Sequence, residues 1–431
     1  MEQSEKLIKN KPYQLLISAQ LISNLGDWLS ILAVFTLVGL KWEATPLQVS
    51  LIILSLALPM TLLGPVAGVL ADRWERKYIM IISDTARGFI IFGLVFANEL
   101  WHVYSLLFGL GIFSALFTPA KNGKLKEIVP DHHMQQAASI SSIIESGTKI
   151  IGPAVSGLLL ALWSFKIIFI LDAITFLLSV LFLLKIPTNP SQILNEEDEE
   201  NKLKKNFIKE MLDGFSFIKG IPAIMYGTLL MAVTMFVIQM SDSQFVTLFR
   251  ELKEVSPRLI GTVMTASGAG FLFTGIILSK FEIKNAIKAM AGGILALGLG
   301  FGTLAILTDI SLSNPMFWAP SITFLACVGA GYVFIPFQAN VLKLTPEHMT
   351  SRTFGTIGSI MTFSSLVGPI AGGFLANLFG VIPIFIVTSS GLCFISVIAF
   401  ILRAQSKGKK GEPYVTESNG ELQRRAEAQH T

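Results

Sequence analysis

Long apolar segments constrain this chain more than any other feature of its sequence. A helix needs roughly 20 mostly apolar residues to cross about 30 Å of hydrocarbon, and runs of that length recur along almost all of the 431 residues. Charged residues make up 14% of the chain, against the ~25% that is usual in soluble proteins. Backbone groups in lipid must be satisfied internally, and the runs lack the alternation of membrane strands. The sequence therefore predicts an all-α membrane protein.

Polar breaks divide the apolar runs into twelve expected spans. They cover residues 13–40, 47–71, 78–98, 103–121, 137–162, 166–186, 222–248, 258–280, 286–308, 317–343, 354–378 and 381–403. Lys6, Lys9 and Lys11 precede the first run, as in a signal peptide. That run is too long for a removable segment and no clear cleavage site follows it, so we expect it to be the first span.

The longest break separates two sets of six spans. We expect an N-terminal half at 1–186, a cytoplasmic linker at 187–221, a C-terminal half at 222–403 and a disordered cytoplasmic tail at 404–431. The linker holds the acidic run 196–200, followed by lysines. Apolar residues from Phe207 to Ile218 recur at helical spacing, which predicts an amphipathic helix on the membrane surface.

The basic residues of the short loops predict the orientation. They gather after spans 2, 4, 6, 8 and 10, at Arg73, Arg76, Lys77, Lys121, Lys124, Lys126, residues 202–209, Lys280, Lys284, Lys343 and Arg352. The break after span 7, with Arg250, Lys253 and Arg258, is an exception that Glu251 and Glu254 offset. We expect a multi-pass protein of the cell (inner or plasma) membrane with both termini in the cytoplasm.

The two halves repeat at an offset of 216 residues. This offset aligns the segment 129–132 with 345–348, and 152–157 with 368–373. It also aligns Phe169 and Ile170 with Phe385 and Ile386. With six spans per half, both halves cross in the same sense, so the repeat axis lies along the membrane normal and we expect the substrate near the midplane between the halves.

Residues 68–80 read Gly-Val-Leu-Ala-Asp-Arg-Trp-Glu-Arg-Lys-Tyr-Ile-Met. They resemble the signature of the major facilitator superfamily between spans 2 and 3, G-x-L-a-D-R-x-G-R-K, with Glu75 in place of the usual glycine. The resemblance implies the major facilitator fold, with twelve transmembrane helices in two parallel-repeat six-helix halves. It also implies a gate or conformational lock that stabilises the outward-facing state, and we carry this role to Gly68, Asp72, Arg73, Arg76 and Lys77. The other interpretation is that these charges only set the topology.

Gly-Pro blocks in spans 5 and 11 resemble the antiporter motif of exporters in this superfamily. The residues are Gly152, Pro153, Gly157, Gly368, Pro369, Gly372 and Gly373. Span 5 has Ser156 for the first glycine of the final pair. Small residues four apart let helices approach closely, and proline permits bending, so we expect helix bends here. Ordinary tight packing is the alternative.

Shorter segments are similar to the branch of macrolide-efflux proteins, the enterobactin exporter and lysophospholipid transporters. These segments are 25–28 in span 1, 117–120 at the end of span 4 and 213–215 before span 7.

Charges inside the spans are candidates for coupling or for lining a cavity, because each costs roughly 2.5–3.5 kcal/mol on insertion scales. Asp27 lies near the middle of span 1, where it binds cargo or a proton or else bonds a neighbouring helix. Glu145 and Lys149 sit four apart on span 5, hence on one face, and Asp84 and Arg87 sit three apart on span 3. We expect each pair to be a local ion pair, while Lys149 in the cavity is the rival interpretation. Asp172 and Asp242 lie in spans 6 and 7, the latter near the outer end.

No motif points to catalysis or to a cofactor. The chain has no G-x-x-x-x-G-K-[ST], H-E-x-x-H or C-x-x-C, and Cys327 and Cys393 lie inside apolar runs. We expect a monomeric secondary transporter, not an enzyme, with no metal, cofactor or nucleic-acid partner. The leading hypothesis is proton-coupled export of a small amphiphilic compound such as a drug, macrolide or siderophore, with another coupling ion left open. A lysophospholipid flippase or uptake carrier and a non-transporting receptor or scaffold are the alternatives.

Overall fold

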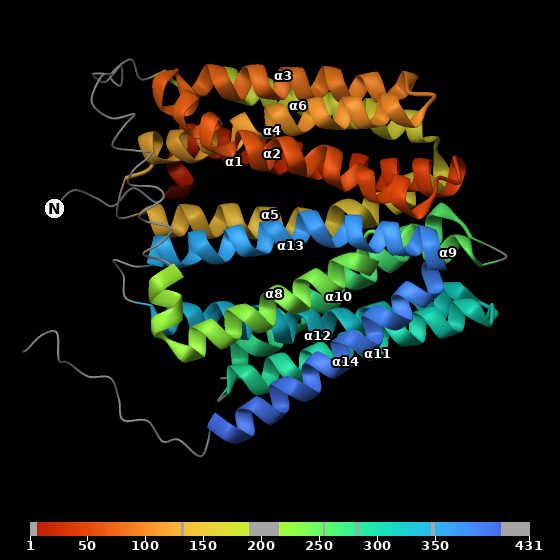
Figure 1. Cartoon of the computed structure of the whole chain (residues 1–431). Coiled ribbons are helices and arrows are strands. Elements are labelled where there is room, and N and C mark those ends of the chain that lie inside the picture. The colour runs from red at the N-terminus through yellow and green to blue at the C-terminus, as the bar shows by residue number, and fades with distance from the viewer. Residues whose placement is uncertain are drawn as a thin grey trace, which may run out of the picture.

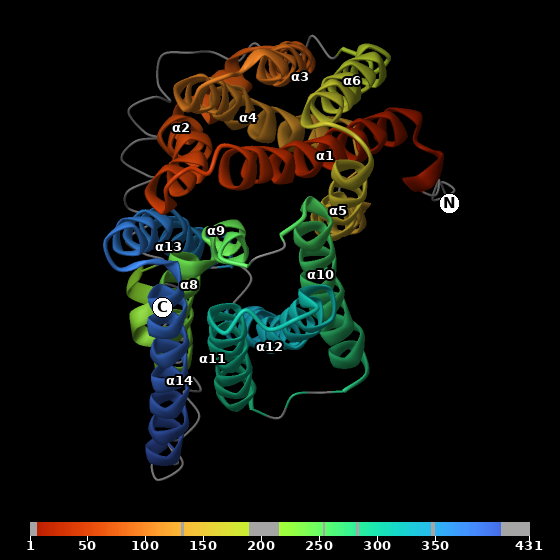
Figure 2. The ribbon, with the colours of Figure 1, turned by 90° about the vertical axis from the view of Figure 1, so that its right-hand side faces the viewer.

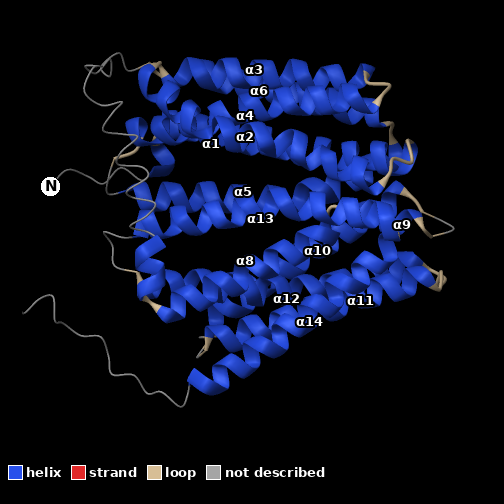
Figure 3. Cartoon of the chain, viewed as in Figure 1, coloured by secondary structure: helices blue, strands red, loops and turns tan. Residues whose placement is uncertain are grey.

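The computed structural model describes residues 7–130, 133–188, 215–252, 255–281, 283, 285–345 and 350–406. These residues are almost entirely helical (Figures 1 and 3). The helices are α1 (Lys11–Thr36), α2 (Pro46–Arg73), α3 (Arg76–Gly93), α4 (Leu100–Ile128), α5 (Met134–Leu162), α6 (Phe165–Leu184), α8 (Pro222–Asp242), α9 (Phe245–Arg250), α10 (Pro257–Lys280), α11 (Ala286–Asp309), α12 (Pro315–Leu344), α13 (Thr350–Phe379) and α14 (Val381–Ser406).

Each expected span overlaps one long helix. Among the described residues, eleven segments are long and apolar enough to cross a membrane; α5 is the twelfth long helix of the bundle. A π-helical turn at Leu37–Lys41 continues α1, and the short α9 follows α8 within a single candidate span. Most of the expected linker helix lies outside the described residues; its last part, 215–220, is helical.

One expected boundary was wrong. Helix α4 extends to Ile128, so Lys121, Lys124 and Lys126 lie in its last turns and not in a loop. Lys124 is fully buried, and Lys121 is nearly so. The apolar run is shorter than the helix because the final turns carry lysines, two of which, Lys121 and Lys124, form ion pairs inside the protein.

Side-chain caps begin several of the helices. Thr45 forms a capping box with Gln48, and Pro46 occupies the first turn of α2. Ser256 caps α10, which also begins with a proline. These caps satisfy backbone N–H groups at the ends of the bundle.

The helix packing repeats between the halves. In the first half α1 packs on α5 and α6, α2 on α4, and α3 on α4 and α6; in the second half α8 packs on α13 and α14, α10 on α12, and α11 on α12 and α14. Between the halves, α2 packs on α13 and α5 on α10. These pairs correspond one to one when each half is read in order, which confirms the parallel repeat. Figure 2 shows the two groups of helices, with α2, α13, α5 and α10 where they meet.

The close contacts between the halves that the described glycines make lie at one end of the bundle. We call the end where α1 begins and α14 ends the terminal end, and the opposite end the distal end (Figure 1). At the distal end a Cβ added to Gly157 of α5 would overlap the backbone of Gly261 of α10, and one added to Gly373 of α13 would overlap Ser50 of α2. Toward the terminal end of the same helices, a Cβ added to Gly68 or Gly147 would meet no described atom within 4 Å. The interface is therefore closed distally and open toward the termini.

Candidate functional site

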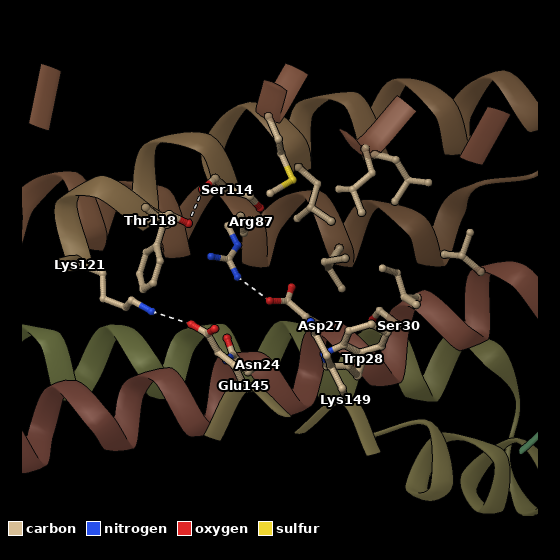
Figure 4. A pocket seen from close by; sticks show the side chains of 18 residues that line it. Asn24, Asp27, Trp28, Ser30, Arg87, Ser114, Thr118, Lys121, Glu145 and Lys149 are labelled. Carbon is tan, nitrogen blue, oxygen red and sulfur yellow. Dashed lines mark hydrogen bonds and ion pairs between the residues drawn. The ribbon is translucent and has the colours of Figure 1, made fainter. Parts of the chain in front are cut away.

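A cavity of about 280 Å³ lies among α1, α2, α3, α4 and α5. Its polar lining includes Asp27, Arg87, Lys121, Glu145 and Lys149 (Figure 4). The rest of the lining is mainly apolar and includes Ile31, Val34, Leu56, Met60, Ile91, Leu107, Leu110 and Phe117. The structure thus gathers the charges of four spans around one amphiphilic space.

Arg87 of α3 is the centre of the charge network in this cavity. Its Nη2 donates to Asp27 Oδ2 of α1 at 2.9 Å, and its Nη1 lies 3.2 Å from Asp84 Oδ1 one turn earlier. The guanidinium carbon lies 4.3 Å from the ring centroid of Phe176 and 5.1 Å from that of Phe117. The expected Asp84–Arg87 pair is confirmed, and Asp27 bonds a neighbouring helix through Arg87.

The two carboxylates that pair with Arg87, and the neighbouring Asp172, differ in their access to the cavity. The Asp27 side chain is 33% exposed, whereas that of Asp84 is fully buried and accepts a hydrogen bond from Ser179 at 2.5 Å. Asp172 of α6 is also fully buried, and Thr175 donates to it at 3.0 Å. A Cβ added to Gly26 would overlap Asp172, so the glycine lets α1 approach this carboxylate. Asp27 is the member of the three that lines the cavity.

Glu145 has a different partner from the one that its spacing predicts. The expected Glu145–Lys149 ion pair is wrong: Lys121 of α4 donates to Glu145 at 3.1 Å, and Gln20 of α1 donates to it at 3.3 Å. Figure 4 shows Lys121 reaching Glu145 from the facing helix. The exposed Lys149 lines the cavity and pairs with no residue that the structure describes. The rival interpretation, Lys149 in the cavity, is the one that the geometry supports.

No group of three His, Cys, Asp or Glu side chains suited to a metal ion occurs among the described residues. The carboxylates of Asp27 and Asp84 converge on a guanidinium, which already supplies their positive charge. The site is therefore organised by ion pairs within the protein.

Polar contacts at the distal end join the two halves. Gln244, between α8 and α9, donates to Ser50 Oγ at 2.7 Å and to the Pro46 carbonyl at 3.1 Å. Arg250 of α9 donates to the carbonyls of Gly39 at 3.2 Å and Ala44 at 2.8 Å. Sequence reasoning missed these contacts, although Arg250 stood out as an exception to the loop-charge pattern.

Comparison with known proteins identifies the family. The model of the Major Facilitator Superfamily matches residues 16–369. The chain belongs to the major facilitator superfamily. Macrolide efflux protein A of Streptococcus pyogenes is 26% identical over 353 residues, 79% of this chain and 84% of that protein. An uncharacterized MFS-type transporter of Bacillus subtilis (strain 168), YfiS, is 39% identical over 404 residues, 94% of this chain and 95% of that protein.

A solved structure shares the fold of this superfamily member. It is a bacterial homolog of the human lysosomal transporter Spinster in an inward-facing, occupied conformation, with a TM-score of 0.70 and 14% identity. The alignment covers 95% of this chain and 100% of that one. The protein is thus a multi-pass transporter of the cell membrane with the twelve-helix major facilitator fold.

The superfamily signature at 68–77 lies where α2 ends and α3 begins. Arg76 donates to Glu127 of α4 at 2.8 Å and to the Ala71 carbonyl at 3.3 Å, and Lys77 donates to the Leu184 carbonyl at 2.9 Å. Arg73 is exposed in the last turn of α2. The side chain of Asp72 lies outside the described part of the structure.

Glu75, which departs from the superfamily signature, has a partner of its own. Lys124 of α4 lies 3.1 Å from Glu75 and 2.7 Å from Glu127. Two carboxylates thus neutralise a lysine that is fully buried. The glycine of the signature is replaced here by a counter-ion.

The Gly-Pro blocks make equivalent contacts in both halves. Gly152 packs on Trp28 of α1, and Gly368 packs on Gln239 of α8. Ser156 donates to the Leu29 carbonyl at 2.8 Å, at the position where Gly372 meets the Met240 backbone. Gly157 and Gly373 face the other half, as described above. Pro369 lies inside α13, and the side chain of Pro153 lies outside the described residues. Close packing between helices is what these blocks provide in this conformation.

Proposed function

We propose that this transporter exports an amphiphilic organic compound in exchange for protons. The observation that carries the proposal is the cavity of α1–α5, where paired and unpaired charges alternate with apolar side chains. Such a surface suits a cargo with both a polar and an apolar part. The similarity to a protein named for macrolide efflux supports export as the direction.

The contacts between the halves support alternating access. If the loop charges orient the protein as expected, the terminal end faces the cytoplasm and the cavity loads from that side. Opening to the outside would separate Gly157 from Gly261 and break the hydrogen bonds of Gln244 and Arg250. Closing the terminal end would bring the open stretch of α2 around Gly68 toward α13, beside the gate position of Asp72.

Asp27 is the residue that we propose for coupling. A buried charge needs a counter-ion, and Asp27 shares Arg87 with Asp84 while facing the cavity. A proton can take the place of Arg87 on Asp27, and the guanidinium would keep Asp84 as its partner. Moving one charge through about 100 mV supplies about 2.3 kcal/mol. Binding of a proton or of the cargo at Asp27 is then coupled to the opening of one end of the bundle and the closing of the other.

The proposal is tested with inverted membrane vesicles and a panel of labelled amphiphiles, with and without an imposed proton gradient. We expect uptake into the vesicles for at least one amphiphile, collapse of that uptake with a protonophore, and none in the Asp27→Asn variant. Transport of lysophospholipid alone would favour the lipid-carrier alternative. A lack of any transport by folded, reconstituted protein would favour a receptor or scaffold.

A further inference from the structure

A second cavity, of about 150 Å³, lies in the C-terminal half among α8, α9, α10, α11 and α12. Its lining differs in kind from that of the first cavity. Three rings, Phe245, Phe301 and Phe334, line it together with Met264 and other apolar side chains, and Asp242 is the charged residue among them.

The Asp242 carboxylate has no counter-ion in this cavity. Its side chain is exposed at the cavity, and no hydrogen bond or ion pair joins it to a residue that the structure describes. In the first cavity, by contrast, both Asp27 and Glu145 are paired with a cation of a facing helix. An ion in an apolar site costs several kcal/mol unless a partner neutralises it. The cavity therefore favours a ligand that brings a positive charge.

The position of Asp242 in its helix strengthens this preference. Asp242 is the last residue of α8, where the carbonyl groups give the helix axis its negative end. A cation is favoured at such an end by both the carboxylate and the helix. The carboxylate thus lies at the negative end of α8, and no described cationic side chain lines the cavity beside it.

The aromatic lining favours an organic cation over a metal ion. The rings of Phe245 and Phe301 lie 5.6 Å apart and both pack on Phe385, which fixes them against the cavity. The ring faces of aromatic side chains attract ammonium groups. A hard metal ion would need six or more oxygen ligands, and the described lining offers chiefly hydrocarbon.

We propose that this cavity is a subsite for the ammonium group of a hydrophobic cation, with Asp242 as its counter-ion. The subsite deepens the function proposed above, since it gives the transported amphiphile a positive charge. The Asp242 carboxylate pairs with the charged nitrogen, and the phenylalanine rings contact its apolar substituents.

Cys327 provides a reporter that does not depend on transport. It lines the same cavity as Asp242, whereas Cys393 faces Gly298 of α11. In a Cys393→Ser background, purified protein is treated with N-ethylmaleimide, and the rate at which Cys327 is alkylated is measured by mass spectrometry. The probe is benzyltrimethylammonium, and its control is the neutral isostere neopentylbenzene.

We expect benzyltrimethylammonium to slow the alkylation of Cys327 at least threefold at saturation, and neopentylbenzene to have little effect. Asp242→Asn should abolish the protection, and Asp242→Glu should restore part of it. Asp309→Asn is the matched control, because Asp309 is an exposed carboxylate at the end of α11, outside the cavity.

Equal protection by the neutral isostere, or unchanged protection in Asp242→Asn, would overturn the proposal. Gel filtration checks that each variant is folded, and equilibrium dialysis with the radiolabelled cation replaces alkylation if Cys327 does not react. Absence of binding in both measurements also overturns the proposal. Cation binding that persists when proton-driven transport is absent would leave the subsite intact and refute only the proposed transport cycle.

Discussion

The Asp27→Asn variant should keep its fold and lose gradient-driven transport, whereas Arg87→Met should lose both. The two residues share one ion pair, but their surroundings differ. Asp27 is 33% exposed to the cavity, and Arg87 is 5% exposed and also holds the fully buried Asp84. Asparagine can still accept the N–H of Arg87, so the change replaces a charged acceptor by a neutral one.

The magnitudes follow from these contacts. Two charge centres about 4 Å apart interact by about 4 kcal/mol at an effective dielectric constant of ~20. Removing one partner from a buried pair typically costs about 3–5 kcal/mol, and Arg87→Met would leave Asp84 with Ser179 as its remaining hydrogen-bond donor among the described residues. For Asp27→Asn we expect a loss of about 1 kcal/mol, the difference between a charged and a neutral hydrogen bond.

The assay combines stability with transport. Unfolding of purified protein in one detergent, followed by tryptophan fluorescence, ranks the variants, and vesicle uptake measures coupling. Asp84→Asn combined with Arg87→Met should recover part of the stability lost in Arg87→Met, because it removes the stranded charge. The reasoning fails if Asp27→Asn destabilises the protein as much as Arg87→Met, or if it accumulates substrate against a gradient as wild type does.

Three further predictions concern the other contacts. Lys121→Met and Glu145→Gln should show a coupling energy of about 1 kcal/mol or less in a double-mutant cycle, because Glu145 is half exposed; a coupling above about 3 kcal/mol would contradict this. Gly157→Leu should separate the halves distally, where its side chain meets Gly261, and raise the labelling of a cysteine placed at Ser50, whereas unchanged labelling would refute the close contact. Asp72→Asn should slow turnover more than it lowers expression, as measured by initial uptake rates per folded protein, and a wild-type rate would remove the gate assignment.

Local patterns predicted the fold and one of the two local pairs. Apolar runs located the twelve helices, and an offset of 216 located the equivalent glycines. Asp84 and Arg87 pair because three residues place both on one helix face. The same rule failed for Glu145 and Lys149, because Glu145 faces α4 and forms its ion pair with a lysine of that helix. Lys121 is 24 positions away in sequence, and its place at the end of an apolar run suggested a loop.

Rules based on local spacing could not predict contacts between segments that are distant in the sequence. Asp27 and Arg87 are 60 positions apart, and only the packing of α1 against the other helices of its half brings them together. Arg250 broke the loop-charge pattern because its guanidinium binds carbonyl groups of the other half and does not mark the cytoplasmic side. Both exceptions to a sequence pattern, Arg250 and Glu75, make specific contacts that we did not infer from the sequence.

The distribution of ion pairs bears on how the halves can move. Every ion pair between described residues joins two residues of the N-terminal half, and none crosses the interface. The crossing polar contacts between described residues are the hydrogen bonds of Gln244 and Arg250 and one between the Ser50 and Ser243 hydroxyls at 3.4 Å, and glycine packing adds to them. Five hydrogen bonds at a net ~0.5–1.5 kcal/mol each amount to about 2.5–7.5 kcal/mol, and new contacts at the terminal end would offset part of this. The energy of one or two protons crossing the membrane, about 2.3 kcal/mol each per 100 mV, is then of the size needed to bias a rigid-body exchange between the two arrangements.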